Sequence, residues 1–332
     1  MAERPVEADP ADPAPASTPA APAPWKVVWC LDAWADLAAR VSAVLPPWAR
    51  LHVFDPALGS LASQAAGAAV LIPTTGSVDA GVIAAAVPTL RLVAQPASGV
   101  ENIDLAAAAA AGVPVVACAG VNAAACAEAA VMGLLLAARR WNGLAASVDA
   151  RRIGTPPGTT LAGKRLGVVG LGGAIGSRVG RAAGAGLGME VVGWGAADAA
   201  SGGRPGFAAW VATLDALTLH CPLTPATARL VDATALGAAK PGLILVNFSR
   251  GRVVDEAALL AALEAGTVGA AALDVFCEEP VDPASPLAAH PRVVVTPHCG
   301  VATEEVYDEY ARRLVEAMVC VREGRAVTGR VA

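Results

Sequence analysis

The sequence predicts an α/β protein built from two doubly wound parallel-sheet domains. Its 332 residues are enough for two domains, because a domain usually takes roughly 100–200 residues. From residue 25 onward, short uninterrupted apolar runs alternate with helix-length, alanine-rich segments. A second series of the same kind follows a Gly/Pro-rich link at 153–163. Uninterrupted apolar runs are typical of parallel strands, because helices cover both faces of such a sheet.

The first series of elements extends over residues 25–121. A last helix, predicted at Glu304 to Arg322, is expected to pack back on this series, so the first domain is predicted to be 25–121 plus 301–332. Turn residues separate the elements of the series. The expected strands are WKVVWC (25–30), LHVF (51–54), AAVLIP (68–73), LRLVAQ (90–95) and VPVVAC (113–118).

The second series extends over residues 122–300 and begins with a long helix predicted from about Asn122 to Arg140. Strand and helix alternate again, as in a second parallel sheet. The expected strands are RLGVVGLG (165–172), MEVVGW (189–194), DALTLHCP (215–222), LILVNF (243–248), AALDVF (271–276) and VVVTPH (293–298).

Composition argues against a membrane or secreted protein. Residues 1–24 are mostly Pro, Ala and acidic residues, which cannot bury enough apolar surface to offset their ordering entropy, so we predict a disordered tail. The tail lacks the basic start and apolar run of a signal peptide. Hydrophobic residues make up 55% of the chain, but alanine is the commonest of them, and a membrane span needs about 20 strongly apolar residues. No membrane partner is expected.

Charge and cysteine usage narrow the class further. The net charge is −5 without any Lys/Arg run, so no nucleic-acid partner is expected. Seven scattered cysteines never form a C-x-x-C pair, which favours a reducing, cytoplasmic location. Cys221, Cys277 and Cys299 stand beside motifs described below. Buried free cysteines are commonly small hydrophobes, so no metal site is expected, and an oxidation-sensitive pocket is the alternative hypothesis.

The segment LGVVGLGGAIGSRVG predicts a strand, a glycine-rich turn and a helix. This arrangement brings backbone N–H groups close to a pyrophosphate at the positive end of the helix. Gly170, Gly172 and Gly176 give G-x-G-x-x-x-G, one residue longer than the dinucleotide-binding spacing. An ordinary tight turn is therefore the alternative interpretation.

The ribose-binding residue of a dinucleotide site is not determined by the sequence. An acidic residue is expected at the end of the next strand, but Gly195 stands there. Asp198 could bind the adenosine ribose or be an exposed loop residue, and Arg204 could meet a 2′-phosphate or be a solvated charge. The cofactor is therefore predicted to be NAD or NADP, with NAD favoured.

Polar segments follow several strands of the second series and should meet at the carboxyl edge of one sheet, where open α/β folds bind ligands. They contribute three ionisable groups: Arg250, Glu279 and His298. The alternatives are that Glu279 lies in a surface turn, that His298 is a core histidine, and that Arg250 is an ion-pair partner of Asp255 or Glu256.

VNFSRG, ALDVFCEEP and TPHCG, in this order behind a glycine-rich turn, resemble the D-2-hydroxyacid dehydrogenase family over residues 90–300. The resemblance implies a flavodoxin-like substrate domain, a Rossmann NAD(P)-binding domain and a homodimer. It also implies hydride transfer between a nicotinamide cofactor and a small 2-oxoacid or D-2-hydroxyacid.

The resemblance also implies the catalytic roles. His298 would donate a proton to the developing alkoxide and reclaim it in the reverse reaction. Glu279 would orient the imidazole and favour its charged form. Arg250 would pair with the substrate carboxylate or carbonyl through its planar fork. His220 is expected to be a packed neighbour of the nicotinamide pocket, and His52 and His290 to be surface or loop residues.

Further site residues follow from the same resemblance. The loop SGVENID would hold the substrate carboxylate through the backbone of Ser98, Gly99 and Val100, or be an ordinary turn with Asp104 as helix N-cap. The expected cofactor-binding residues are Gly170, Gly172, Ala174, Ile175, Gly176, Pro222, Thr227, Phe248, Ser249 and Asp274.

Three features distinguish this sequence within the family. The loop GLGGAIG has one extra glycine, the following helix (RAAGAGLGM) is one residue longer, and the stretch from Gly195 to His220 is short. Thr74, Thr75 and Ser77 are neutral where phosphoglycerate dehydrogenases present basic residues, so a small 2-oxoacid without phosphate is expected. Two alternatives remain: a dinucleotide-sensing binding protein and a redox-silent dehydrogenase homologue.

Overall fold

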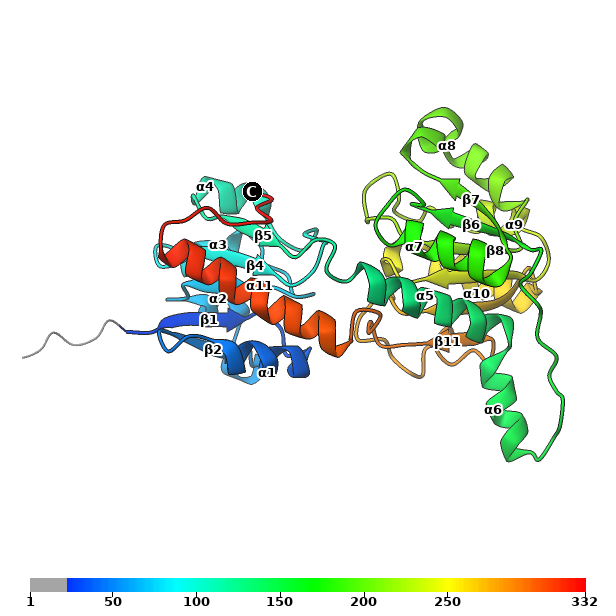
Figure 1. The fold of residues 1–332 in the computed structure, drawn as a ribbon, viewed down its shortest axis with the longest axis horizontal. Helices are drawn as coiled ribbons and strands as arrows, with labels where there is room; N and C mark the ends of the chain where they lie inside the picture. Colours follow the sequence, from blue (N-terminus) through cyan, green and yellow to red (C-terminus); the bar gives the residue numbers. More distant parts are fainter. Residues whose placement is uncertain (1–22) are drawn as a thin grey trace, which may run out of the picture.

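The computed structural model describes residues 23–332 and shows two parallel sheets in separate α/β bodies (Figure 1). The predicted fold class is thereby confirmed. Residues 1–22 of the predicted disordered tail lie outside the described residues. Within residues 23–332, no helix combines the length and apolar character needed to cross a bilayer.

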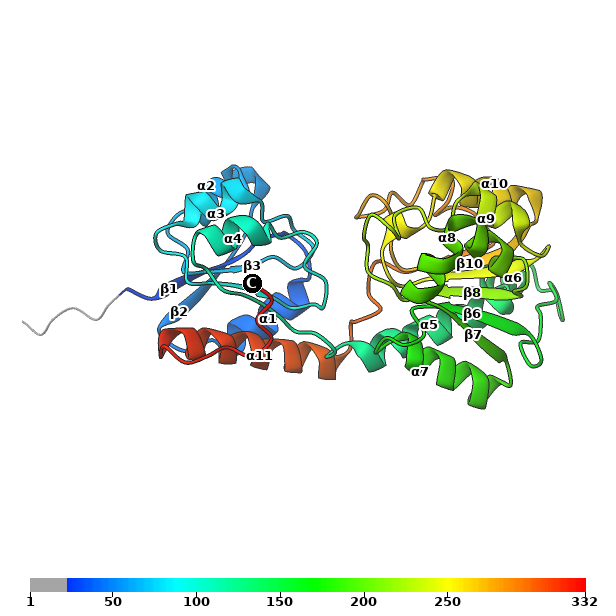
Figure 2. The same ribbon diagram turned by 90° about the horizontal axis from the view of Figure 1, so that it is seen from above.

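The first sheet has five strands in the order β2-β1-β3-β4-β5. Helices α2 to α4 lie on one face, and α1 and α11 on the other (Figure 2). The strands are β1 (Trp25–Trp29), β2 (Ala49–Val53), β3 (Val70–Ile72), β4 (Leu92–Gln95) and β5 (Val115–Ala117). The helices are α1 (Ala35–Val44), α2 (Leu61–Ala65), α3 (Ala80–Ala86), α4 (Leu105–Ala110) and α11 (Glu304–Arg322), with a 3₁₀ turn at Pro56–Leu58.

Helix α11 returns to the first sheet, as predicted from the sequence. Its first turn is capped by Thr303, whose hydroxyl accepts a 3.3 Å hydrogen bond from the N–H of Val306, the usual role of an N-cap threonine. Tyr310, Leu314 and Met318, spaced four residues apart, are fully buried against the sheet. The chain therefore crosses between the two bodies twice, once before α5 and once before α11 (Figure 1).

The second sheet has six strands in the order β11-β10-β9-β8-β6-β7. The strands are β6 (Arg165–Val169), β7 (Glu190–Trp194), β8 (Ala216–Leu219), β9 (Leu243–Asn247), β10 (Val268–Leu273) and β11 (Val293–Val295). The helices are α5 (Ala123–Ala138), α6 (Trp141–Asp149), α7 (Gly176–Arg181), α8 (Ala196–Val211), α9 (Ala233–Ala238) and α10 (Glu256–Ala265), with a 3₁₀ turn at Gly251–Val253.

The structure shows how the unusual length between the glycine turn and β8 is accommodated. Helix α7 continues into a π-helical turn at Ala182–Gly186, which is how a helix absorbs one extra residue. Helix α8 begins at Ala196, directly after the Gly195 N-cap, is kinked at Gly203, whose backbone is not helical, and occupies the short stretch before β8 without another strand. Asp198 was expected in an exposed loop. This expectation is wrong, because Asp198 lies in the first turn of α8.

Candidate active site

A cleft of about 730 Å³ lies between the two bodies, at the carboxyl ends of strands from both sheets. Arg250, Glu279 and His298 line it from the second body, and Ser98 and Gly99 from the first. The predicted cofactor-binding residues that also line the cleft are Ile175, Pro222, Phe248, Ser249 and Asp274. The structure therefore brings together segments that are far apart in the sequence.

His298 and Glu279 form a hydrogen-bonded pair in this cleft. Nδ1 of His298 lies 2.7 Å from Oε2 of Glu279, and Oε1 of Glu279 accepts a 2.9 Å hydrogen bond from the N–H of Phe276. An ionised carboxylate only accepts hydrogen bonds, so the ring proton of a neutral His298 is placed on Nδ1. Nε2 is then the ring nitrogen that can exchange a proton with a substrate.

Glu279 remains ionised in this setting. Burial is the largest single influence and raises its pKa, but the hydrogen bond and charge of His298, the Phe276 N–H and the charge of Arg250 outweigh burial and leave the pKa below its usual value. The carboxylate side chain is 30% exposed and the imidazole 22%.

Asp274 fixes the turn that presents His298. His298 adopts the left-handed backbone conformation, with φ of 53°, which is uncommon for a residue with a side chain. Its N–H donates to the Asp274 carbonyl at 2.8 Å, while the Asp274 carboxylate accepts from the Cys299 and Gly300 N–H groups at 2.8 and 3.0 Å. Asp274 is only 3% exposed. Its observed contacts therefore anchor the histidine turn, a role that the sequence did not suggest.

Arg250 forms an ion pair with Glu101 across the cleft. The two side chains are 34% and 33% exposed, and within residues 23–332 no other ion pair joins the two bodies. The hypothesis that Arg250 pairs with Asp255 or Glu256 is wrong. Asp255 caps α10 and pairs with Arg229, whereas Glu256 accepts a 2.6 Å hydrogen bond from the N–H of Cys277.

The loop that carries Glu101 is held by hydrogen bonds to its backbone. The Gln95 amide donates to the carbonyls of Thr74 and Gly99, each at 2.9 Å, and the Asn102 amide donates to Gly76 at 2.6 Å. A Cβ atom at position 99 would meet the ends of the Arg250 and Glu101 side chains, so a larger residue there would displace this ion pair.

Of the three residues of this loop that were predicted to bind the substrate carboxylate, two lie at the cleft and one does not. Ser98 and Gly99 line the cleft, but Val100 does not; it packs against the core of the first body. Asp104 caps α4 by accepting a 2.9 Å hydrogen bond from the N–H of Ala107, so the alternative of a capped turn holds as well.

The glycine-rich turn after β6 fits a dinucleotide pyrophosphate. Gly170 has φ of +83° and its backbone lies against the carbonyl of His220, while a Cβ atom at Gly176 would clash with the Gly170 carbonyl. Above Gly172 there is open space. Two glycines thus close the turn tightly and the third leaves room for a ligand beside the backbone, which is what dinucleotide binding requires. Ala174 lies in the same turn, where its carbonyl accepts a 2.7 Å hydrogen bond from Arg178.

Neither candidate for the adenosine ribose is free. Oδ2 of Asp198 accepts a 2.8 Å hydrogen bond from the N–H of Gly195. Arg204 donates to the carbonyls of Ala228 and Arg229 and lies 3.3 Å from Asp232. Both side chains are therefore engaged by their own surroundings, and the choice between NAD and NADP stays a prediction.

Thr227 and His220 were both predicted to lie near the nicotinamide pocket, and both belong to the segment around the end of β8. The hydroxyl of Thr227 donates to the Pro222 carbonyl at 2.6 Å and shapes the loop after β8. His220 lines the cleft, its Nε2 lies 2.9 Å from the Thr218 hydroxyl, and its buried Nδ1 has no partner within the described residues. Burial lowers the pKa of His220 to about 4. It is neutral at physiological pH, and its unpartnered nitrogen is suited to a polar group of a ligand.

Three thiols lie near the site, of which Cys277 is exposed and Cys221 and Cys299 are partly buried. Burial raises the pKa of Cys221 and of Cys277 to about 11, and a thiol rather than a thiolate is a poor nucleophile. The hypothesis of an oxidation-sensitive pocket stays a prediction, since Cys221 and Cys277 line the cleft. Among residues 23–332, no cluster of His, Cys, Asp or Glu is arranged to hold a metal ion.

Comparison with known families agrees with this geometry. The family model for the NAD-binding domain of D-isomer specific 2-hydroxyacid dehydrogenases matches residues 131–300. The chain belongs to this family. The match begins within α5 and ends at Gly300, so it includes the glycine-rich turn, Arg250, Glu279 and His298.

Similar proteins span the family. The D-3-phosphoglycerate dehydrogenase of Mycobacterium leprae (strain TN) is 40% identical over 267 residues, covering 78% of this chain and 50% of that protein. That of Archaeoglobus fulgidus is 35% identical, covering 79% and 51%. This 2-hydroxyacid dehydrogenase family member thus spans about half the length of the curated relatives it matches.

Solved structures show the same fold. The TT0316 protein from Thermus thermophilus has a TM-score of 0.79 and 32% identity, and the comparison covers 92% of this chain and 100% of that one. A putative D-isomer specific 2-hydroxyacid dehydrogenase from a Polaromonas species has a TM-score of 0.77 and 26% identity, with coverages of 93% and 100%.

The same cleft is also lined by three residues that the sequence analysis did not predict. Trp34 lies across the cleft from His298, with ring centroids 5.7 Å apart in an edge-to-face arrangement. Tyr310 of α11 and Glu101 complete this wall. All three belong to the first body, so their proximity to the catalytic pair depends on how the two bodies sit. In the sequence, only their position after a strand or on the returning helix could have indicated that they belong to the site.

Proposed function

We propose that this chain is an NAD(P)-dependent oxidoreductase that reduces a small 2-oxoacid to the D-2-hydroxyacid. The observation that supports it best is the single cleft that contains a cation, Arg250, and a hydrogen-bonded acid pair, His298 and Glu279, beside a glycine-rich turn. The match to an NAD-binding domain supports the cofactor.

The side chains have complementary tasks in this reaction. A bound dihydronicotinamide supplies the hydride for the ketone carbon. His298 gives its Nε2 proton to the ketone oxygen, on which negative charge develops, and Glu279 stabilises the imidazolium before that transfer. Arg250 holds the substrate carboxylate and orients the ketone toward the cofactor side of the cleft. Trp34 covers the imidazole and limits the access of water.

The wall of the cleft contributed by the first body favours a substrate without phosphate. Among the described residues, that wall contains hydroxyls, amides, aromatic rings and one carboxylate, Glu101, but no Lys or Arg. A second anionic group directed at this wall would face Glu101 with no cation of the first body beside it, which costs free energy; besides Arg250, the second body places Arg252 at the cleft. Glyoxylate, pyruvate and hydroxypyruvate are therefore the substrates we propose.

A phosphorylated 2-oxoacid is the second candidate. It is favoured by the 40% identity to proteins named D-3-phosphoglycerate dehydrogenase. The two candidates differ in the charge of the group beyond the ketone, so a panel of substrates separates them.

The test is a panel of 2-oxoacids with NADH and with NADPH, followed by the loss of nicotinamide absorbance. We expect turnover of glyoxylate, pyruvate or hydroxypyruvate, and at least about tenfold lower kcat/KM for phosphohydroxypyruvate, because leaving one charge unpaired typically costs about 2–5 kcal/mol. Product chirality is checked by a D-specific enzymatic assay.

Each other outcome of the panel has a distinct meaning. Preferred reduction of phosphohydroxypyruvate would support the second candidate. Binding of a dinucleotide without turnover of any 2-oxoacid would indicate a dinucleotide-sensing binding protein. Failure to bind either dinucleotide, followed by nicotinamide fluorescence, would indicate a redox-silent homologue and would overturn the proposal.

We also propose a homodimer, on the basis of exposed apolar side chains near α6, which projects from the second body (Figure 1). Val148 on α6 is 75% exposed and Ile153 just beyond it 99%. Met132 and Leu135 on α5 and Trp141 on α6 are also exposed. Neighbouring exposed apolar residues are typical of an interface.

Seven free cysteines support the proposal of a reducing, cytoplasmic compartment.

Light scattering after size exclusion tests the dimer. The wild-type mass should be twice the 32.9 kDa of the chain. Val148→Asp combined with Ile153→Asp should give the monomer, because charges are buried at an apolar interface only at high cost. Leu58→Asp, at an exposed apolar residue on the first body, is the matched control and should stay dimeric. A monomeric wild type would contradict the proposal.

A further inference from the structure

A second cavity lies in the second body at the amino ends of strands β6, β8, β9 and β10. Its volume is about 270 Å³, slightly below the ~300–1,000 Å³ typical of pockets for larger organic ligands. The same four strands end, at their carboxyl side, in the cleft described above. The cavity is therefore separated from the catalytic residues by the length of the sheet.

Cationic groups predominate among the charged residues that line this cavity. Arg140, Lys164 and Lys240 are its cations, and Asp215 is its one carboxylate. Lys240 Nζ lies 3.1 Å from Oδ1 of Asp215, and Oδ2 accepts a 2.8 Å hydrogen bond from the N–H of Arg165. Asp215 is thus satisfied by Lys240 and the backbone, and the lining retains a net charge of about two positive units.

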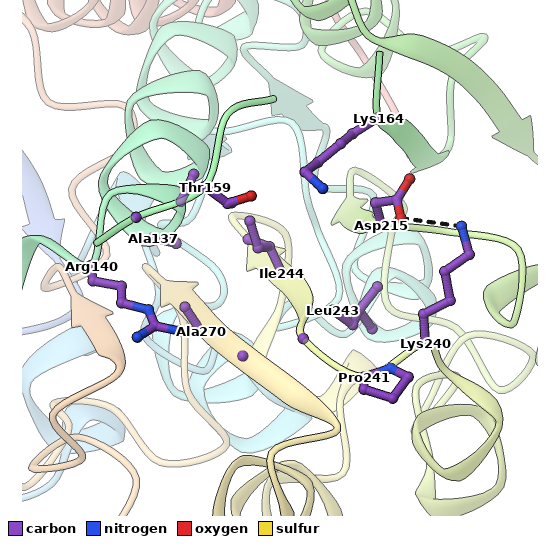
Figure 3. Close-up of a pocket in the computed structure, with 14 residues that line it drawn as sticks. Ala137, Arg140, Thr159, Lys164, Asp215, Lys240, Pro241, Leu243, Ile244 and Ala270 are labelled. Atoms are coloured by element: carbon purple, nitrogen blue, oxygen red, sulfur yellow. Dashed lines mark hydrogen bonds and ion pairs between the residues drawn. The ribbon is translucent and has the colours of Figure 1, made fainter. Parts of the chain in front are cut away.

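The two other cations are not paired. Within residues 23–332, neither Arg140 nor Lys164 takes part in an ion pair. Figure 3 shows the Lys164 ammonium and the Thr159 hydroxyl directed into the open centre, with Arg140 on the opposite side from Lys240. Three hydrogen-bond donors of this kind around one space match the acceptor oxygens of an anion.

The backbone keeps the cavity open. A Cβ atom at Gly158 would lie 2.7 Å from the Ala138 carbonyl, and one at Gly269 would lie 2.8 Å from the Gly242 carbonyl. Larger residues at these positions would therefore force the chain to move. Ala137 and Ala270 add only methyl groups. The rest of the wall is backbone and the apolar side chains of Pro241, Leu243 and Ile244, so the charged lining groups are the three cations and Asp215.

Arg140 reaches this site from an unusual backbone conformation. It has φ of 52°, in the left-handed region, and forms the N-cap of α6 directly after α5 ends. A non-glycine residue in this region is unfavourable, and such positions cluster at functional sites. The turn places the guanidinium at the cavity rather than along the exposed side of α5 (Figure 3).

We propose that this cavity binds a small tetrahedral dianion, either inorganic phosphate or the phosphate group of a small phosphomonoester. The guanidinium of Arg140 and the ammonium of Lys164 would neutralise two negative charges, and the Thr159 hydroxyl would donate a further hydrogen bond. The site is distinct from the pyrophosphate-binding turn, because Gly170 and Gly172 lie at the other end of β6.

The test is thermal unfolding of the NADH-saturated protein in increasing phosphate, with ionic strength held constant by NaCl. NADH occupies the glycine-rich turn, so phosphate cannot act there. We expect a saturable rise in Tm of about 2–4 °C. Lys164→Gln and Arg140→Gln should each weaken the apparent affinity about tenfold or more, the usual effect of losing a hydrogen bond to a charged group.

Arg139→Gln is the matched control. Arg139 is the neighbouring, exposed arginine and does not line the cavity, so its loss changes the net charge of the protein equally but should leave the affinity unchanged. Calorimetric titration with phosphate and with glycerol phosphate distinguishes the two sources of the dianion. It also gives the affinity directly for any variant that unfolds at lower temperature.

Three results would overturn the proposal. One is a wild type whose Tm and heat of titration do not respond to phosphate beyond the effect of NaCl. The second is an equal response in wild type, Lys164→Gln and Arg140→Gln, which would place the anion elsewhere. The third is an equal loss of affinity in Arg139→Gln, which would indicate a general charge effect. Failure of NADH to bind contradicts the proposed function alone, since the comparison of variants remains valid without it.

Discussion

His298→Gln is expected to lower the kcat for 2-oxoacid reduction by about 10²–10⁴-fold, the usual contribution of a general acid or base. Glutamine keeps a hydrogen-bonding side chain beside Glu279 but cannot transfer a proton. The affinity for NADH should change little, because the glycine-rich turn lies on other elements. Steady-state kinetics with the preferred 2-oxoacid, together with a fluorescence titration of NADH, measures both quantities.

The pH dependence of this effect follows from the Glu279 contacts. Because the pKa of Glu279 is held below its usual value of 4.5, the carboxylate stays ionised from that pH upward and protonates only as the pH falls further. Reduction needs a protonated acid and therefore slows as the pH rises. Wild-type kcat should also fall as the pH drops through the lowered pKa of Glu279, and this acid-side fall should be absent from Glu279→Gln, which cannot ionise.

His52→Gln is the control for these variants. His52 lies exposed on β2 and outside the cleft, so its replacement should leave kcat and the pH profile unchanged. His220 is not an alternative acid, because burial lowers its pKa to about 4. A His298→Gln variant with wild-type kcat would show that the proton comes from another group and would refute the assignment.

Much of the fold could be predicted because the central strands of both sheets, such as β3, β4, β8 and β9, are buried on both faces. Runs such as LILVNF and VVVTPH lack the polar residues of a one-sided strand, and the structure has β9 and β11 within them. The returning helix was predicted with the bounds that are observed for α11. In contrast, the π-helical turn at Ala182–Gly186 and the replacement of a loop by α8 depend on packing against neighbouring elements, which local pattern does not contain.

The catalytic pair was predictable for a similar reason, whereas its surroundings were not. Glu279 and His298 follow strands of one sheet, so the topology alone brings them together. The ion pair between Glu101 and Arg250 joins residues 149 positions apart on different bodies. The edge contact of Trp34 with His298 also depends on how the bodies meet, which neither spacing nor hydropathy encodes.

The second large effect is expected for Arg250→Gln, which should lower kcat/KM by about 10²–10³-fold, the usual cost of removing one positioned donor to a charged reacting group. The loss should fall on both KM and kcat, because the guanidinium binds the substrate carboxylate and also orients the ketone. Steady-state kinetics and the Kd of a non-reducible analogue such as oxamate separate the two contributions.

Glu101→Gln is expected to act in the opposite direction on KM, since Glu101 occupies the same guanidinium that the substrate carboxylate needs. Removing that competitor should lower KM by up to about fivefold, which is the range for an ion pair that is one third exposed. Glu101→Asp, which keeps the charge, is the control and should stay closer to wild type. If Glu101→Gln instead loses kcat as Arg250→Gln does, then Glu101 holds the guanidinium in its working position, and the substrate must bind Arg250 together with Glu101.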